Sequence, residues 1–248
     1  MIPRPDRERI TDMQQGSLMK GNAGKWREIF SKGGPRNHYP HSYVVSWYFK
    51  NVHPDTRFLE HRKVLDIGCG TAPDMTLFIS EGFEYWGIDV TDECFDQILN
   101  TAESRRLDIS RISLGLFSPP ELPYGDNSFD AVIGLESLHF NIGHDDMGAM
   151  VGEIFRTMKT GGHFLFTTIN KKHYFVVDEH TSFTSGNCLV IGEGFAEGER
   201  AGLRYHVFSC EEEIRDYFHK FAEVHVGEYL LDTCDNKPDA YYVIFGKK

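Results

Sequence analysis

Short apolar segments alternate with helical patterns along the chain from about residue 63 onward. The expected strands cover 63–67, 83–90, 112–117, 129–135 and 163–169, and helices are expected to start near Pro73, Thr91, Asp145 and Ser209. Short apolar runs of this kind are typical of parallel strands that are buried on both faces. Their alternation with helices predicts a doubly wound α/β sheet.

The last part of the chain changes this pattern. Ser209 followed by Glu212 predicts a helix with a capping box, and its apolar face repeats at Ile214, Tyr217, Phe218 and Phe221. Strands are then expected at 223–231 and 240–246, joined by the turn-rich segment 232–239. Because this connection has no room for a helix, the two strands must be antiparallel.

Two segments lie outside the alternating pattern. The first, residues 1–62, is rich in aromatic side chains, and Tyr43 and Trp47 stand one helical turn apart. It is expected to form a helical cover that packs on the core, which is also compatible with a lid over a ligand. The second, 170–204, is expected to be an irregular insertion in the domain 63–248, either shaping a substrate pocket or simply decorating the surface.

The charge of the chain disfavours nucleic acid as a partner. The sequence of 248 residues contains 26 Lys and Arg against 37 Asp and Glu, a formal charge of −11. Through residue 63 there are 12 basic and 6 acidic side chains, which leaves 14 and 31 in the remainder. Such an acidic body repels a phosphate backbone at long range.

The five cysteines are widely spaced and show no CxxC pair, so neither a disulfide framework nor a zinc site is expected. The sequence contains no apolar run long enough for a membrane span and no apolar leader at its start. These features predict a cytoplasmic protein with reduced thiols and no membrane partner.

A glycine-rich turn follows the first expected strand. Gly68 and Gly70 allow the backbone to turn tightly and to approach a ligand closely, and Asp89 ends the next strand nineteen residues after Gly70. A carboxylate there can accept hydrogen bonds from both hydroxyls of a ribose, which predicts an adenosine-containing ligand. NAD is disfavoured because Pro73 replaces the third glycine of its fingerprint and because Asp66 precedes the turn.

These residues resemble the class I S-adenosylmethionine-dependent methyltransferases, in particular the branch that acts on small molecules. The first motif of that family is similar to residues 64–71, VLDIGCGT. Further segments match in order at 122–124, 126–132, 136–139 and 153–162. The resemblance covers residues 63–248 and implies a mostly parallel seven-stranded sheet with an antiparallel last strand.

The resemblance also implies the cofactor S-adenosylmethionine, with S-adenosylhomocysteine as the product, and a set of residues around it. Gly68, Cys69 and Gly70 would line its methionine part, with Asp66 near the amino group. Asp89 would bind the ribose, and Val90 would touch the adenine. The remaining cofactor residues would be Leu135 and Glu136 at the end of the fourth strand, and Phe117 and Ser118 after the third.

Two positions depart from the pattern of the family. Ala72 replaces the third glycine of its loop, and Ser118 stands where an acid usually binds the adenine amino group. The adenine contact is therefore expected from the Ser118 hydroxyl or from the backbone.

For the transfer step, His139 is the candidate general base, because its usual pKa suits neutral pH. Local packing is the alternative role for this histidine. Tyr39, Tyr43 and His173 are weaker candidates for substrate contacts. No metal is expected, although His139, His144, Asp145 and Asp146 form a loose group of possible ligands.

The sequence thus predicts methyl transfer to an oxygen or nitrogen of a small molecule. Two alternatives stay open: a methyltransferase that acts on tRNA or protein, and a noncatalytic module that binds S-adenosylmethionine.

Overall fold

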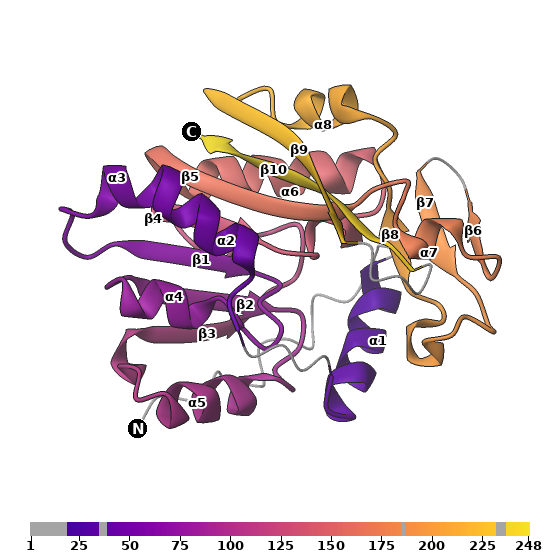
Figure 1. Ribbon diagram of the computed structural model, residues 1–248, viewed down its shortest axis with the longest axis horizontal. Helices are drawn as coiled ribbons and strands as arrows, with labels where there is room; N and C mark the ends of the chain where they lie inside the picture. The colour runs from indigo at the N-terminus through magenta and orange to yellow at the C-terminus, as the bar shows by residue number, and fades with distance from the viewer. Residues whose placement is uncertain (1–18, 35–38, 185–186, 232–236) are drawn as a thin grey trace.

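A seven-stranded sheet forms the centre of the molecule (Figure 1). The computed structural model describes residues 19–34, 39–184, 187–231 and 237–248. The strands are β1 (Lys63–Ile67), β2 (Glu84–Asp89), β3 (Ile112–Leu116), β4 (Phe129–Gly134), β5 (Met158–Ile169), β9 (Glu223–Leu231) and β10 (Asp239–Lys247). Their order in the sheet is β3-β2-β1-β4-β5-β10-β9.

The strand directions confirm the predicted topology. Strands β1 to β5 pair in parallel, whereas β10 is antiparallel to both β5 and β9. All six residues of β4 are buried, as expected for a central parallel strand. The start of β5 was misplaced: this strand begins at Met158, where Phe129 pairs with Met158 before the register shifts at Ala131. The residues at this irregular start include Lys159, Thr160 and two glycines, so the sequence shows no apolar run there that would predict a strand.

Helices cover both faces of the sheet and form two apolar cores. On one face lie α2 (Ser42–Trp47), the π-helix η2 (Tyr48–Val52), α4 (Met75–Ser80) and α5 (Phe95–Ser104). On the other face lie α6 (His144–Thr157) and α8 (Glu211–Tyr217). This double cover explains why the strands are apolar on both sides.

The predicted capping box of α8 is wrong. The residue before the helix is Cys210, and it makes no side-chain capping bond. The Ser209 hydroxyl instead donates to Asn187 Oδ1 at 3.0 Å, while the Ser209 N–H donates to Glu213 Oε2 at 2.7 Å. The Ser209 hydroxyl is therefore bonded to Asn187, in the distant segment 170–204, and does not cap the helix.

The segment 170–204 is more regular than expected. It contains the short helix α7 (Tyr174–Val177), two strands, β6 (Thr181–Phe183) and β7 (Cys188–Ile191), and the 3₁₀ turn η5 (Gly198–Arg200). With β8 (Arg204–His206) the two strands form an antiparallel three-stranded sheet. This small sheet contributes Leu189, Ile191 and Tyr205 to a third apolar cluster. The glycine-rich and polar composition of the segment does not suggest such a cluster.

The helix α1 (Met19–Ser31) lies against this insertion rather than on the main sheet (Figure 1). The Asn22 side chain makes two hydrogen bonds to the backbone of Arg204: its amide nitrogen donates to the carbonyl at 2.8 Å, and its oxygen accepts from the N–H at 3.0 Å. Residues 1–18 and 35–38 of the predicted cover, and 232–236 of the predicted turn, lie outside the described residues.

Candidate active site

A cavity of about 1120 Å³ lies between the carboxyl ends of the central strands and the helix α1. It is lined by the glycine-rich turn after β1, by the segments that follow β2, β3 and β4, and by residues of α1 and the insertion. Ligands of open α/β sheets bind at this edge. Of the residues predicted for the site, the lining includes Gly68, Cys69, Gly70, Asp89, Val90, Phe117, Ser118, Leu135, Glu136, His139 and His173.

The glycine-rich turn brings bare backbone to the cavity. Gly68 and Gly70 have φ angles of 70° and 51°, which glycine adopts without strain. A Cβ atom at Gly68 would lie 2.5 Å from Cβ of Ser137. Ser137 itself is fixed by a hydrogen bond of 2.6 Å from its hydroxyl to the Ile67 carbonyl. The turn after β1 and the turn after β4 therefore meet without space for a side chain at residue 68.

Asp89 joins this turn to the end of β2. Its Oδ2 accepts from the Gly70 N–H at 3.0 Å and its Oδ1 from the Val90 N–H at 2.7 Å. Burial raises the pKa of Asp89 to about 6. Each carboxylate oxygen keeps acceptor capacity for a further donor, so two adjacent hydroxyls of a ribose fit this side chain.

Asp66 does not line the cavity. Its carboxylate is buried beneath the turn and accepts a hydrogen bond of 2.5 Å from the Tyr85 hydroxyl. Burial raises the pKa of Asp66 to about 7. The place of Asp66 near the cofactor amino group stays a prediction. Its hydrogen bond with Tyr85 fixes the carboxylate under the glycine-rich turn.

The side of the cavity toward β3 suits a flat apolar group. Val90, Leu116, Phe117 and Pro119 line it together with Ser118. The Ser118 carbonyl accepts from the Glu121 N–H at 3.2 Å, which closes a tight turn. The predicted adenine contacts thus share one wall of the cavity.

Glu136 occupies a strained position at the end of β4. Its φ of 55° lies in the left-handed region, and its N–H donates to Thr167 Oγ1 at 2.9 Å. Burial raises the pKa of Glu136, although His41 and Arg200 oppose that shift. Strain of this kind is frequent at binding sites.

His139 follows β4 in the 3₁₀ turn η4 (Leu138–Phe140) and is buried. Its ring contacts Phe140 and Tyr205, with centroid distances of 4.6 and 5.0 Å. Its Nδ1 accepts a long hydrogen bond of 3.4 Å from the Ile169 N–H. Burial lowers the pKa of His139 well below its usual value, and His173 and Arg200 add to this shift. His139 is therefore neutral at physiological pH.

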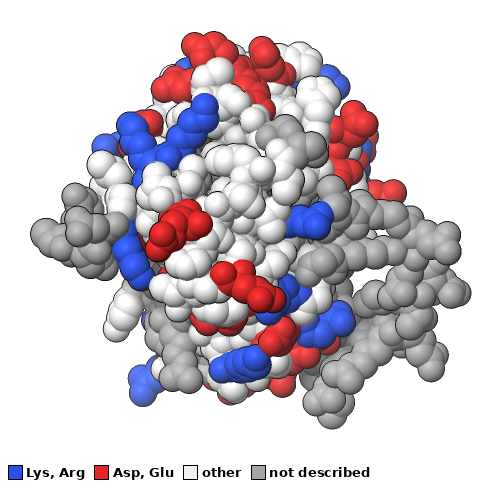
Figure 2. Space-filling view, turned by 90° about the vertical axis from the view of Figure 1, so that its right-hand side faces the viewer, with Lys and Arg blue, Asp and Glu red and all other residues white. Residues whose placement is uncertain are grey.

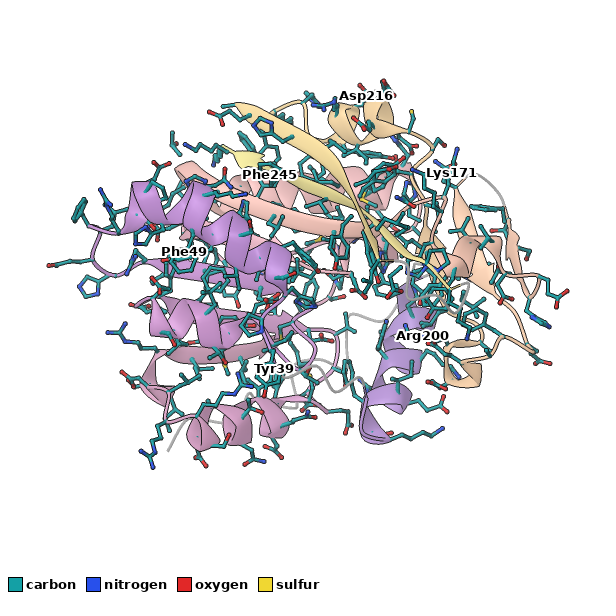
Figure 3. All side chains as sticks on the ribbon, in the orientation of Figure 1. Tyr39, Phe49, Lys171, Arg200, Asp216 and Phe245 are labelled. Atoms are coloured by element: carbon teal, nitrogen blue, oxygen red, sulfur yellow. The ribbon has the colours of Figure 1, made fainter. Side chains whose placement is uncertain are left out.

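The three weaker candidates for substrate contacts differ in position. His173 lines the cavity, but its Nδ1 accepts from the Phe175 N–H at 3.1 Å and so begins α7. Tyr43 is packed against Tyr229 and His41 without lining the cavity. Tyr39 is 75% exposed and lies at Arg105, beside α5 and far from the labelled Arg200 (Figure 3).

Several residues that line the cavity escaped the sequence analysis. His41 comes from the segment before α2 and is paired with Asp74, with 2.8 Å between Nδ1 and Oδ2. Trp26, Arg200 and Tyr205 come from α1, the insertion and β8. No motif links these positions, because they meet only through the tertiary fold.

Metal binding finds no support in the part of the chain that the structure describes, which contains no group of three His, Cys, Asp or Glu side chains placed to hold an ion. Among the same residues, no helix is long and apolar enough to cross a bilayer.

Comparison with known proteins identifies the domain. Residues 64–162 match the family model described as "Methyltransferase domain". A fatty-acid O-methyltransferase of Mycolicibacterium smegmatis is 26% identical over 46% of this chain and 40% of its own length. The methyltransferase GfsG of Streptomyces halstedii is 31% identical over 43% of this chain and 37% of its own length. The chain thus aligns with less than half the length of these relatives.

The fold agrees with this match. A SAM-dependent methyltransferase from Methanosarcina mazei superimposes with a TM-score of 0.57 at 18% identity, covering 85% of this chain and 98% of its own. The glycine turn, the carboxylate of Asp89 and the apolar wall beside it suit the cofactor of such enzymes. Residues 64–162 thus match a methyltransferase domain, and the fold around them is similar to that of the class I methyltransferases, whose cofactor is S-adenosylmethionine.

Proposed function

We propose that the protein transfers the methyl group of S-adenosylmethionine to an oxygen or nitrogen of a small molecule. The observation that carries the proposal is Asp89, which lines the cavity with both oxygens fixed by backbone N–H groups of the turns around it. When bound, S-adenosylmethionine supplies a methyl group on a positively charged sulfur, which a lone pair of the acceptor displaces in line.

The residues of the chain then have mainly to align the acceptor with that methyl group. Alignment in a closed site can contribute about 7–11 kcal/mol to catalysis. The cavity supports this role, because residues of α1 and of the insertion line it together with the loops at the strand ends. We propose that the predicted N-terminal cover, residues 1–62, acts on this site through α1.

The size and the walls of the cavity favour a small acceptor. Its volume is large enough for a nucleoside cofactor and a second small molecule. Both curated relatives are named methyltransferases, and the name of one specifies a fatty acid and transfer to oxygen. The name of the fatty-acid enzyme supports oxygen as the acceptor atom.

The distribution of charged side chains on the face shown in Figure 2 does not favour the binding of a nucleic acid. On the face that Figure 2 shows, basic and acidic side chains are interspersed, and the basic ones form no continuous band over the described residues. A basic groove near Arg105, Arg106 and Arg111 would favour an enzyme that acts on nucleic acid or protein. Two of these arginines have local partners: Arg111 lies 3.4 Å from Asp108, and Arg105 donates to Thr76 Oγ1 at 2.7 Å. A tRNA or protein acceptor is the second candidate.

Calorimetry with S-adenosylhomocysteine tests the cofactor part of the proposal. Removing charge-assisted hydrogen bonds of about 1.5–3 kcal/mol each predicts that Asp89→Ala weakens binding roughly ten- to hundredfold. Asp96→Asn, on the exposed side of α5, is the matched control and should bind like the unmodified protein. Unchanged affinity in a folded Asp89→Ala protein would contradict the assignment.

A further inference from the structure

Two residues that line the cavity, Trp26 and Tyr205, carry buried hydrogen-bond donors whose protons have no acceptor among the described residues. The indole N–H of Trp26 is buried and has no partner among the residues that the structure describes. The buried Tyr205 hydroxyl interacts with Arg200, which can only donate, so the hydroxyl's own proton has no acceptor among these residues. A buried donor without an acceptor is destabilising, so a site that retains two of them is suited to an acceptor group from a ligand.

His139 adds a third donor through its tautomer. Its Nδ1 accepts from the Ile169 N–H, so a neutral ring carries its proton on Nε2. Within the described residues, Nε2 has no assigned hydrogen bond, and the ring lines the cavity. A ring in this state donates from Nε2 and has no lone pair there with which to remove a proton.

Arg200 supplies a positive charge at the same place. Its guanidinium lies over the rings of Trp26 and Phe175, 5.8 and 5.1 Å from their centroids. Its Nε donates to Glu197 Oε2 at 2.6 Å, and Glu197 accepts a second bond of 2.5 Å from the Tyr174 hydroxyl. This anchoring orients the guanidinium beside α1 (Figure 3), where Arg200 also interacts with the Tyr205 hydroxyl.

The four side chains form one cluster, which we call the donor cluster: Trp26, His139, Arg200 and Tyr205. The ring of Phe140 joins three of them, with centroid distances of 5.5 Å to Trp26, 4.6 Å to His139 and 5.1 Å to Tyr205. Burial raises the pKa of Tyr205 to about 12, so its hydroxyl remains a donor at neutral pH.

Resting on the proposed function, we infer that the acceptor molecule carries a carboxylate, which the donor cluster binds. A carboxylate accepts several hydrogen bonds at once and carries the charge opposite to that of Arg200. The remaining walls near the cluster, Phe140, Ile169 and Phe175, are apolar, so the rest of the acceptor is an apolar body.

Glu136 and Asn141 are the acceptor groups to weigh against this inference. Glu136 lines the same cavity, and a protonated amine would favour it. However, burial raises the pKa of Glu136, and its charge is opposed by the nearby His41 and Arg200. The Asn141 oxygen, also buried without a partner among the described residues, can accept from a hydroxyl elsewhere on the acceptor.

Three eight-carbon probes that differ only in the head group test the inference: octanoate, octanamide and octylamine. Their binding is measured by calorimetry with and without saturating S-adenosylhomocysteine. We expect octanoate to bind at least tenfold more tightly than octanamide, and octylamine to bind most weakly. Equal binding of octanoate and octanamide, or preference for octylamine, would overturn the inference.

Variants assign the effect to the cluster. Arg200→Met is expected to weaken octanoate binding at least tenfold and to leave octanamide unchanged, whereas Lys32→Met, at an exposed site just after α1, should change neither. Tyr205→Phe keeps the ring and removes only the hydroxyl, so it should weaken octanoate three- to tenfold without lowering the melting temperature. Octanoate affinity unchanged in both cluster variants would contradict the inference.

The same measurements separate this inference from the proposed function. S-adenosylhomocysteine should bind the Arg200→Met and Tyr205→Phe proteins as it binds the original chain. Absence of S-adenosylhomocysteine binding in the unmodified protein would contradict the proposed function, whereas the octanoate preference would still report on the donor cluster.

Discussion

At the scale of single residues, His139 shows how burial changes the role of a side chain. Its position after β4 and the usual pKa of histidine suggest a general base. In the fold, an apolar and partly cationic environment keeps the ring neutral, and Nδ1 is directed to the Ile169 N–H. If the methyl group goes to the carboxylate inferred above, the nucleophile is already ionised and the transfer needs no base.

Two substitutions distinguish the roles of His139. Glutamine places an amide N–H near the position of Nε2 but cannot serve as a base, whereas alanine removes both functions. If the ring donates, His139→Gln should keep turnover within about threefold of the original and His139→Ala should lose at least tenfold, a loss of about 1.4 kcal/mol or more. The measurement is S-adenosylhomocysteine formation with a metabolite extract as the source of acceptor.

Cofactor affinity serves as the control, because neither variant alters the glycine turn or Asp89. Equal and large losses of turnover in both variants would instead favour His139 as the base.

At the scale of elements, the antiparallel hairpin of β9 and β10 determines the far edge of the sheet. Its strands pair from Glu223 with Lys247 to Leu231 with Asp239. A Cβ atom at Gly246 would overlap the Glu223 carbonyl oxygen and approach the Phe164 ring to 3.1 Å. At Gly227, in the same hairpin, a Cβ atom would meet nothing within 4 Å.

This contrast gives a matched pair of glycine substitutions. Gly246→Ala is expected to lower the free energy of unfolding by about 2–3 kcal/mol, because strand β9 must move to make space. Gly227→Ala should change it by less than about 0.5 kcal/mol. Urea unfolding followed by circular dichroism measures both, and equal stability of the two variants would show that the hairpin tolerates the clash.

At the scale of the whole molecule, the N-terminal segment contains two parts that play different roles. Val44, Trp47, Tyr48 and Val52 are buried in the same core cluster as α4 and α5. The helix α1 contacts the insertion and lines the cavity instead. Only α1 is placed to act as a lid, while α2 and η2 are part of the folded core.

The core role of α2 predicts a large loss of stability at Trp47. Trp47→Ala should lower the free energy of unfolding by about 3–5 kcal/mol, as is usual for a buried aromatic residue. The exposed neighbour Ser46 is the control, and Ser46→Ala should have little effect. Thermal unfolding measures both; a stable Trp47→Ala protein would indicate that α2 only rests on the surface.

The sequence predicts those features of the fold and the site that depend on residues close together in the chain. Gly68, Gly70 and Asp89 follow from a strand, a turn and the next strand, and the sheet follows from repeated apolar runs. The donor cluster was not predicted, because Trp26, Arg200 and Tyr205 come from elements up to 179 positions apart (26 to 205) that carry no shared spacing. The hydroxyl of Ser209 shows the same limit: its partner, Asn187, is distant in sequence and replaces the expected cap.

The paired hydrogen bonds between Asn22 and Arg204 have a consequence for redesign. They join α1 to the end of the insertion, so the two pieces that carry Trp26 and Arg200 form a single structural cassette. Exchanging α1 alone, or residues 170–204 alone, with those of a related enzyme would separate donors that have to act together. Grafting both at once is the way to transplant acceptor preference between such proteins.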